Sequence, residues 1–539
     1  MSHIDIDQLL AGLPSRISAI PRRWADSAPQ RSALHDGTRH WTYGELADTV
    51  DACAAMLRQL EVRPGDRLMV VGENSVAQVV LTFAAASIDA WIVHVNARLS
   101  EREVDQIRDH SGARRVLYTA GASPEAAAHA ARHGAMPVAP PAPAPRAAAA
   151  AVTTGATQPT TQSSALLALG LLAGPLNQAA VAEPVAKSSA EQVAALVYTT
   201  GTTGQPKGVM LTHRNLLFIA AVSSTIRGLT PHDRAYCVLP ISHVYGLTSV
   251  SLGTLYAGAC LYLCPRYTPA ALLKAIRDDR ITILQGVPAM YARLLETLGG
   301  PGTPLPSCLR FIYAGGSPLT PALKAEAEKL LGLPLHNGYG MTETSPTISQ
   351  TRFDQPRNDT SVGHLIPGVE ARIVDPAGAD VRLGTPGELW IRGPNVMLGY
   401  YKAPEQTAET MRPGGWLNTG DMARQEADGA LFIVGRTKEL IIRSGFNVYP
   451  LEVETVLNAH PAVTQSAVVG RPAADGNEEV VAFVELDPRH TVTPDQLQQY
   501  LADQLSPYKR PSEIVIMQTL PAAATGKILK SQLRQFAQK

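Results

Sequence analysis

The sequence predicts an α/β fold, and two observations carry this prediction. Residues 40 to 135 alternate helical and strand patterns, which implies a mostly parallel sheet covered by helices. After about Arg436, a stretch of roughly 100 residues has a pattern of its own, enough for a small α+β domain. We therefore expect a large α/β part followed by a smaller C-terminal domain.

The individual elements follow in order along the chain. A capping box at Thr42–Glu45 predicts the start of a helix, because the two side chains satisfy each other's backbone N–H groups. A buried strand is expected at 66–72, followed by a helix from about Val76. Further strand-like runs are at 193–200, 310–314, 388–392, 430–434 and 439–442. The C-terminal pattern predicts a helix at 450–459, strands at 465–470 and 480–486, and a helix at 494–505.

Composition excludes several classes of protein. Of 539 residues, 45% are hydrophobic and 17% charged, a globular balance. Lys+Arg and Asp+Glu both number 47, so nothing indicates a nucleic-acid partner held by bulk positive charge. Five scattered cysteines argue against a disulfide framework and for a reducing compartment. The apolar candidate Ser163–Ala182 is broken by glycine and proline, so no transmembrane segment is expected. The sequence predicts a soluble, cytoplasmic protein.

Residues 137–187 differ from the rest of the chain. This stretch is rich in Ala, Pro, Thr and Ser, a composition typical of a flexible surface insertion. We assign it no function.

The sharpest motif is Tyr198–Gly208, after an apolar strand and before a helix expected near Thr212. Its glycines let the backbone approach a bound anion, its threonines donate hydroxyl groups, and Lys207 adds positive charge. A nucleoside-triphosphatase loop does not fit, because Pro206 and Gly208 stand where that motif needs Gly and Ser/Thr. The phosphate-binding candidates are Thr199, Thr200, Gly201, Thr202, Thr203, Gly204 and Lys207.

Together with four later segments, this loop resembles the adenylate-forming superfamily of acyl- and aryl-CoA synthetases. The other segments are 337–343, 415–421, 435–442 and 525–527, all in the family's order. The resemblance implies a large N-terminal adenylation domain of stacked sheets and helices at 1–436 and a mobile α+β lid at 437–539. It also implies that ATP activates a carboxylic acid to acyl-AMP with release of pyrophosphate, before transfer to CoA.

The resemblance assigns roles to the nucleotide-binding side chains. Lys527 would bridge the two anions that meet during adenylation. Glu343 would hold magnesium, a hard cation that prefers oxygen ligands. Thr342 would bind the α-phosphate, and Asp421 could accept from both ribose hydroxyls. The remaining nucleotide candidates are Asn337, Gly338, Tyr339 (against the adenine ring), Gly340 and Arg436.

The acid and CoA sites are implied in the same way. His243 would abut the substrate carboxylate, and Tyr245, Thr248, Gly315, Gly316 and Gly340 would line the acid pocket. These segments contain no charged residue that could pair with an amine, so a plain carboxylic acid is favoured over an amino acid. A fatty acid and an aryl acid remain equally open. Lys438 stands at the hinge position, and the CoA-binding segment is Ser444, Gly445 and Phe446.

Two alternatives remain at this point. The enzyme could load the phosphopantetheine of a separate carrier protein instead of CoA. A catalytically inactive sensor of AMP or acyl-AMP is a weaker alternative, because Lys527, Glu343 and Asp421 are all present. The sequence predicts neither the acid nor the oligomeric state.

Overall fold

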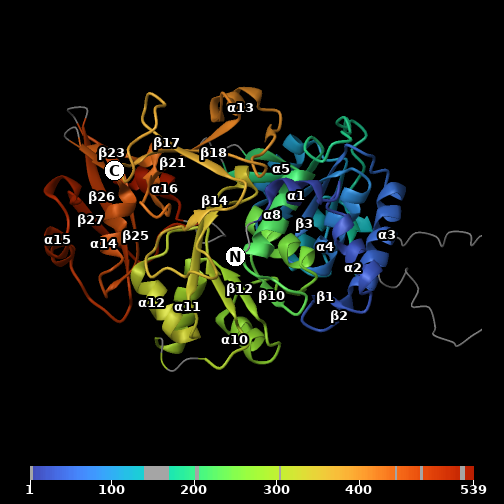
Figure 1. The fold of residues 1–539 in the computed structure, drawn as a ribbon, viewed down its shortest axis with the longest axis horizontal. Helices are drawn as coiled ribbons and strands as arrows, with labels where there is room; N and C mark the ends of the chain where they lie inside the picture. The colour runs from blue at the N-terminus through green and yellow to red at the C-terminus, as the bar shows by residue number, and fades with distance from the viewer. Residues whose placement is uncertain are drawn as a thin grey trace, which may run out of the picture.

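The computed structural model describes residues 4–138, 169–200, 206–300, 302, 305–443, 446–473, 477–522 and 528–538. Figure 1 shows the N-terminal part of the chain, in blue and green, at one end of the molecule and the C-terminal part, in red, at the other. The strands of residues 280 to 340 lie between these two parts.

The first sheet contains the predicted alternation of strands and helices. Helix α3 (Tyr43–Gln59) begins at the predicted capping box, where the N–H of Glu45 donates to Thr42 Oγ1 and the N–H of Thr42 to Glu45 Oε2. Strand β3 is buried along its whole length and is followed by helix α4 (Val76–Ser87). In the described chain the sheet order is β19 (Gly399–Tyr400), β9 (Pro206–Thr212), β8 (Val193–Thr200), β4 (Trp91–Asn96), β3 (Arg67–Gly72), β5 (Arg115–Tyr118), β7 (Leu172–Ala173) and β6 (Met136–Pro137).

The second sheet places the ends of several parallel strands at one edge. Strands β10, β12, β13 and β14 run parallel, whereas β15 pairs with β14 in the antiparallel direction. The carboxyl ends of parallel strands form the usual binding edge of an α/β sheet. The order is β16 (His364–Leu365), β15 (Thr347–Gln350), β14 (Leu335–Gly340), β13 (Phe311–Ala314), β12 (Ile283–Gly286), β10 (Arg234–Cys237), β11 (Cys260–Leu263), β1 (Ser32–His35) and β2 (His40–Thr42).

Helix α8 (His213–Ile226) and the loop after β3 connect the two sheets. Leu217 of α8 belongs to a core cluster that includes residues of both sheets, and Phe218 belongs to a neighbouring cluster. The side-chain amide of Asn74 donates to the carbonyls of Cys237 and Leu239, both at 3.0 Å. The carboxyl ends of β3 and β10 are therefore held side by side.

A third, antiparallel sheet follows. Its members are β17 (Glu370–Val374), β18 (Gly387–Arg392), β21 (Trp416–Gln425), β20 (Met411–Arg412) and β22 (Leu431–Arg436). In the pairing of β21 with β22, Asp421 lies opposite Arg436. This register brings two of the predicted nucleotide-binding residues together.

The C-terminal part has the α+β composition that the sequence predicts. A hairpin of β23 (Ile441–Arg443) and β24 (Phe446–Val448) precedes a sheet of β25 (Val463–Pro472), β26 (Glu478–Leu486) and β27 (Glu513–Met517). Helices α14 (Pro450–Leu457), α15 (Pro494–Ala502) and α16 (Lys530–Ala537) accompany it. Buried side chains such as Val453, Leu457, Val468 and Leu497 form a core separate from that of the large sheets.

The remaining helices cover the sheets or connect strands. They are α1 (Ile6–Ala11), α2 (Ala19–Ser27), α5 (Glu101–Ser111), α6 (Pro124–Arg132), η1 (Tyr245–Leu252), α9 (Gly253–Tyr256), α10 (Pro269–Arg277), α11 (Pro288–Leu298), α12 (Pro321–Leu331), η2 (Thr342–Thr344), α13 (Pro404–Thr410), η3 (Thr437–Glu439) and η4 (Pro507–Lys509). Within the described ranges, none has both the length and the apolar character needed to cross a membrane.

The structure differs from the sequence prediction within residues 137–187. Residues 169–187 are described, and β7 pairs with both β5 and β6. The carbonyls of Ala180 and Val181 accept hydrogen bonds from Arg63 and Arg67, at 2.9 and 2.8 Å. The end of this stretch is therefore an integral part of the first sheet, because the edge strand and two arginine side chains depend on it. Residues 139–168 lie outside the described residues.

Candidate active site

The threonine-rich loop joins β8 to β9, two antiparallel strands of a hairpin. The sequence predicted the strand before this loop and the helix near Thr212, which is α8, but not β9 between the loop and that helix. Thr199 lies opposite Lys207, and Gly208 lies within β9 opposite Tyr198. Gly201, Thr202, Thr203 and Gly204 lie outside the described residues, and only the backbone of Thr200 is described.

Packing also explains the glycine at position 208. A Cβ atom at this position would lie 2.9 Å from a methyl carbon of Leu196 and 3.3 Å from the ring of Tyr198. The position therefore needs glycine because side chains of the paired strand fill the space where a Cβ atom would lie.

The next group of residues surrounds Asp421, the predicted ribose ligand. Asp421 lies on β21 and is only 4% exposed. Its carboxylate accepts from the hydroxyl of Tyr339 and pairs with Arg436 at 3.1 Å between Nε and Oδ1. Burial, and then the negative charge of Asp421, raise the pKa of the Tyr339 hydroxyl well above its usual value, so it remains a proton donor. The structure thus brings three predicted nucleotide-binding residues into direct contact.

Glu343 lies in η2, directly after β14, and is 9% exposed. Its Oε1 accepts a hydrogen bond of 2.8 Å from the hydroxyl of Tyr400 on β19. Lys207 Nζ lies 5.1 Å from the centre of the same tyrosine ring. Tyr400 therefore links the cation of the loop to the predicted magnesium ligand. The sequence analysis missed Tyr400, because a lone aromatic residue far along the chain carries no local signal.

Two further residues of this segment shape the backbone. Asn337 donates its side-chain amide to the carbonyls of Thr360 and Ser361, at 3.1 and 3.0 Å. A Cβ atom at Gly340 would lie 2.0 Å from the carbonyl oxygen of Pro346. Both contacts fix the backbone at the end of β14, and Thr342, which follows this strand, is 7% exposed.

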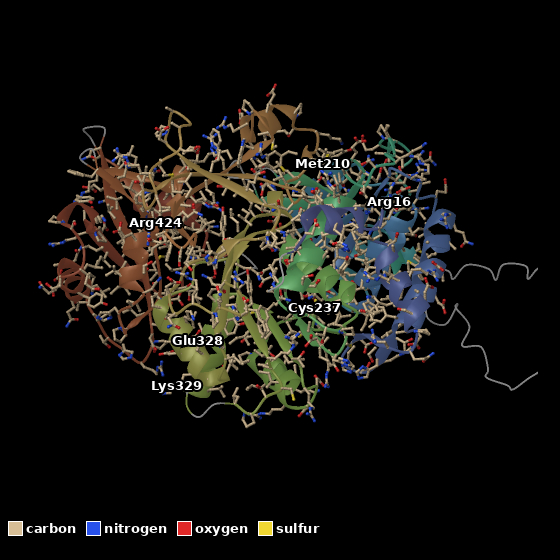
Figure 2. The ribbon with its side chains drawn as sticks, viewed as in Figure 1. Arg16, Met210, Cys237, Glu328, Lys329 and Arg424 are labelled. Carbon is tan, nitrogen blue, oxygen red and sulfur yellow. The ribbon has the colours of Figure 1, made fainter. Side chains whose placement is uncertain are left out.

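His243 marks the expected acid end of the site. It is exposed and lies in the segment that joins β10 to η1; Figure 2 labels Cys237, the last residue of β10. The backbone N–H of Tyr245 donates to His243 Nδ1 at 3.2 Å. In the neutral ring, Nδ1 is then the acceptor and Nε2 carries the proton. His243 can therefore donate a hydrogen bond from Nε2.

The predicted acid pocket lies between η1 and the ends of β12 and β13. The rings of Tyr245 and Tyr313 meet edge to face with their centres 6.1 Å apart. A Cβ atom at Gly315 would lie 3.0 Å from the ring of Tyr313, whereas at Gly316 it would contact only Val287, at 3.6 Å. Thr248 is fully buried, and its hydroxyl has no hydrogen-bond partner among the described residues.

Comparison with known proteins decides which family this arrangement belongs to. The sequence model of the AMP-binding enzyme family matches residues 21–401, well over half of the chain. The chain belongs to the AMP-binding enzyme family. The model of the AMP-binding enzyme C-terminal domain matches residues 452–527, which include the C-terminal core described above.

Relatives within this family share nearly the whole chain. A feruloyl-CoA synthase from Amycolatopsis sp is 33% identical over 522 residues, or 96% of this chain and 98% of the relative. ATP-bound MatB from Rhodopseudomonas palustris is 30% identical and superposes with a TM-score of 0.79, over 96% of this chain and 98% of that one. The o-succinylbenzoate CoA synthetase MenE from Bacillus subtilis, in complex with ATP and a magnesium ion, is 27% identical with a TM-score of 0.78, over 96% and 99%. The chain is an AMP-forming acid–CoA ligase of α/β fold.

Besides the loop residues named above, Lys527, Ser444 and Gly445 also lie outside the described residues. Phe446 is described, and its ring stacks on that of Tyr508 with 4.7 Å between centres. Ala522 and Ile528 form a bridge at the base of the segment that contains Lys527. The structure therefore fixes both ends of the lysine loop.

Proposed function

We propose that this ligase joins a carboxylic acid to CoA in two steps at one site. The acid first attacks the α-phosphorus of ATP, and pyrophosphate leaves; the CoA thiol then attacks the acyl carbon, and AMP leaves. The observation that carries this proposal is the joint placement of Asp421, Glu343 and Lys207, linked through Tyr339 and Tyr400. Together they offer an acceptor for a ribose, a hard oxygen ligand and a cation.

The nucleotide would lie between the hairpin loop and β21. Asp421 would accept from the ribose hydroxyls in place of the hydroxyl of Tyr339, while Lys207 would neutralise phosphate charge. Glu343 would hold magnesium, whose charge offsets that of the phosphate oxygens. His243 would donate from Nε2 to the acid and orient its carboxylate. The same site takes ATP, the acid and CoA as substrates.

Residues 1–436 and 437–539 would act as two bodies that meet at Lys438. On one side of Lys438, Arg436 pairs with Asp421 of the third sheet. On the other side, Glu439 pairs with Lys530 of α16 at 2.9 Å. The chain thus passes from one set of contacts to the other within η3, and the two intervening residues can absorb a rotation. Rotation would exchange the lysine loop for the segment of Ser444, Gly445 and Phe446, which would then contact CoA.

A panel of acids tests this function. Pyrophosphate release would be measured with ATP and magnesium across fatty, benzoic and cinnamic acids, with and without CoA. We expect continuous turnover with one class of acid only when CoA is present. Adenylate formation at the same rate with and without CoA would point instead to a carrier-protein thiol. No pyrophosphate release with any acid would contradict the proposal.

A single variant separates the two steps. Lys527→Ala should lose adenylation, because no cation then bridges the carboxylate and the α-phosphate. It should retain much of the thioester step when acyl-AMP is supplied directly. Stopped-flow measurement of both half-reactions checks this, and an equal loss of both would argue against the role of Lys527.

A further inference from the structure

Arg227 is a core arginine whose partners among the described residues are neutral and leave one of its donors unused. Arg227 follows α8 directly and is 1% exposed, among the largest fully buried side chains. Its Nη1 donates to Gln285 Oε1 at 2.6 Å and its Nε to Gln350 Oε1 at 3.0 Å. The guanidinium also lies 4.7 Å from the ring centre of Tyr313. These contacts position the charge but do not neutralise it.

Three other buried or partly buried arginines of the described residues have their donors satisfied: Arg67 donates to the backbone carbonyls of Gly65, Ser111 and Val181, and two others pair with carboxylates. Arg310 pairs with Asp233, and Arg16 pairs with Asp89 at 2.6 Å. For Arg227, no carboxylate oxygen of the described residues lies within 4 Å of a guanidinium nitrogen. Burial of a charge without a counter-ion is strongly unfavourable, so a buried arginine in this position favours an anion supplied from outside the chain.

Two donors of this cluster are also unused. Within the described part of the chain, neither Arg227 Nη2 nor Gln285 Nε2 has a hydrogen-bond partner, although both atoms are buried. The two side chains are in direct contact, so their free N–H groups belong to one cluster. A carboxylate has two oxygens and can accept from both, which neither a methyl nor an amine group can do.

This donor cluster adjoins the predicted acid pocket. Gln285 and Tyr313 are register partners on β12 and β13, one residue before Gly286 and Ala314. The guanidinium of Arg227 lies against the ring of Tyr313, and a Cβ atom at Gly315 would lie 3.0 Å from the same ring. Its hydroxyl occupies the space that a side chain at Gly338 would need, where a Cβ would lie 2.0 Å away.

The positive charge of Arg227 also affects the pKa values of Tyr245 and Tyr313, two tyrosines of the predicted pocket. Burial raises the pKa of Tyr245 well above its usual value, and the positive charge of Arg227 acts against that rise. The pKa of Tyr313 is raised by burial and opposed by Arg227 in the same way. The sequence analysis missed this charge, because Arg227 lies outside the segments that it assigned to the pocket.

We propose that Arg227 and Gln285 bind a second carboxylate at the far end of the acid, so that the substrate of this ligase is a dicarboxylic acid. One carboxylate would meet His243 and ATP, and the other would accept from Arg227 Nη2 and Gln285 Nε2. This inference rests on the proposed function and replaces the expectation of a plain carboxylic acid.

Matched acids test the inference in the full-length enzyme. Pyrophosphate release would be measured with succinate against butanoate, glutarate against pentanoate, and 4-carboxycinnamate against cinnamate. Each pair differs only in the far carboxylate. For at least one pair we expect kcat/KM to favour the dicarboxylate by about 30-fold or more, because the second carboxylate compensates a buried charge.

Three variants identify the residues responsible. Arg227→Met removes the charge, and Gln285→Glu supplies an internal counter-ion that repels the substrate; each should invert the preference within the matched pair. Arg227→Lys keeps the charge and should retain part of the preference. Thermal unfolding of each variant reports whether it folds. If Arg227→Met does not fold, Gln285→Glu still measures the preference between the matched acids.

The outcomes separate this inference from the proposed function. Turnover of monocarboxylates alone, or an equal loss of both acids of a pair in the variants, would overturn the inference and leave the ligase in place. Absence of pyrophosphate release with every acid would overturn both.

Discussion

Two buried carboxylates of the site, Asp421 and Glu343, each accept a hydrogen bond from a tyrosine hydroxyl. Tyr339 donates to Asp421 and Tyr400 donates to Glu343. Burial raises the pKa of both hydroxyls, so they remain protonated donors at neutral pH. A carboxylate without such a partner would be costly to bury, so the phenols hold the two anions in place.

The first prediction at this scale concerns Glu343. Glu343→Gln should lower kcat/KM for pyrophosphate release by about 100-fold, because a neutral amide is a poor ligand for magnesium. Thioester formation from supplied acyl-AMP should fall much less, since no triphosphate is present in that step. Both rates are measured over a magnesium titration. Tyr400→Phe is the matched control, and a larger loss in that variant than in Glu343→Gln would contradict the assignment.

At the scale of elements, Lys530 ties three segments of the C-terminal part together. Its Nζ lies 2.9 Å from Glu439 of η3 and 2.8 Å from Glu454 of α14. Glu454 is 7% exposed, and burial raises its pKa against the effect of Lys530. Because Lys530 follows the lysine loop by three residues, this ion-pair group also anchors the end of that loop to the proposed hinge.

Removal of this anchor should destabilise the C-terminal core. Lys530→Met leaves the buried carboxylate of Glu454 without its cation and should lower the free energy of unfolding by about 2 kcal/mol. The double variant Lys530→Met, Glu454→Gln should recover more than half of this loss, since no buried charge then remains without a partner. Urea unfolding of the single and double variants measures the effect, and additive losses would show that the pair is not coupled.

A second prediction for elements concerns residues 137–187. The N–H of Val138 donates to the carbonyl of Leu171 at 3.2 Å, so the two ends of residues 139–168 already lie side by side. Replacement of residues 140–166 by a short Gly-Ser linker should leave pyrophosphate release within about twofold of wild type. Deletion of 169–185 should instead abolish soluble expression, because it removes β7 and the acceptors of Arg63 and Arg67. Comparable yields of soluble protein from both deletion variants would contradict the prediction that residues 169–185, and not residues 140–166, are needed for folding.

At the scale of the whole molecule, the buried apolar side chains of the described residues form separate clusters. One lies between the large sheets and another lies in the C-terminal part. Tyr339 packs against a neighbouring cluster that contains residues of the second and third sheets, and Asp421 lies opposite Arg436 in the third sheet. Nucleotide binding should therefore stabilise the large N-terminal part directly.

This expectation is measurable as a change in thermal unfolding. AMP at about 100 times its Kd should raise the Tm by about 3 °C, because a ligand that binds only the folded state stabilises it by about 2.7 kcal/mol. Asp421→Asn should remove most of this shift, since the carboxylate that accepts from the ribose is lost. A full shift in the variant would place the ribose elsewhere.

Local chemistry explains why much of the fold could be predicted from the sequence. The capping box of α3, the continuous apolar run of β3 and the elements of the C-terminal part all depend on neighbours within a few residues. Strand β9 was missed, because its glycine and lysine suggest a loop and only pairing with β8 makes it a strand. Its other partner, β19, lies far along the chain, and such a pairing is not visible in a local pattern.

The same distinction holds for the site. The sequence alone determined the family resemblance and the ordered motifs with Asp421 and Glu343, because a loop that binds phosphate needs certain residue types at certain spacings. Only the tertiary structure decided that Tyr400 joins Lys207 to Glu343, and that Arg227 lies beside the acid pocket. These contacts join residues that are far apart along the chain. The partners of a buried charge come from several strands and helices, and these partners come together only when the sheets pack in the folded protein.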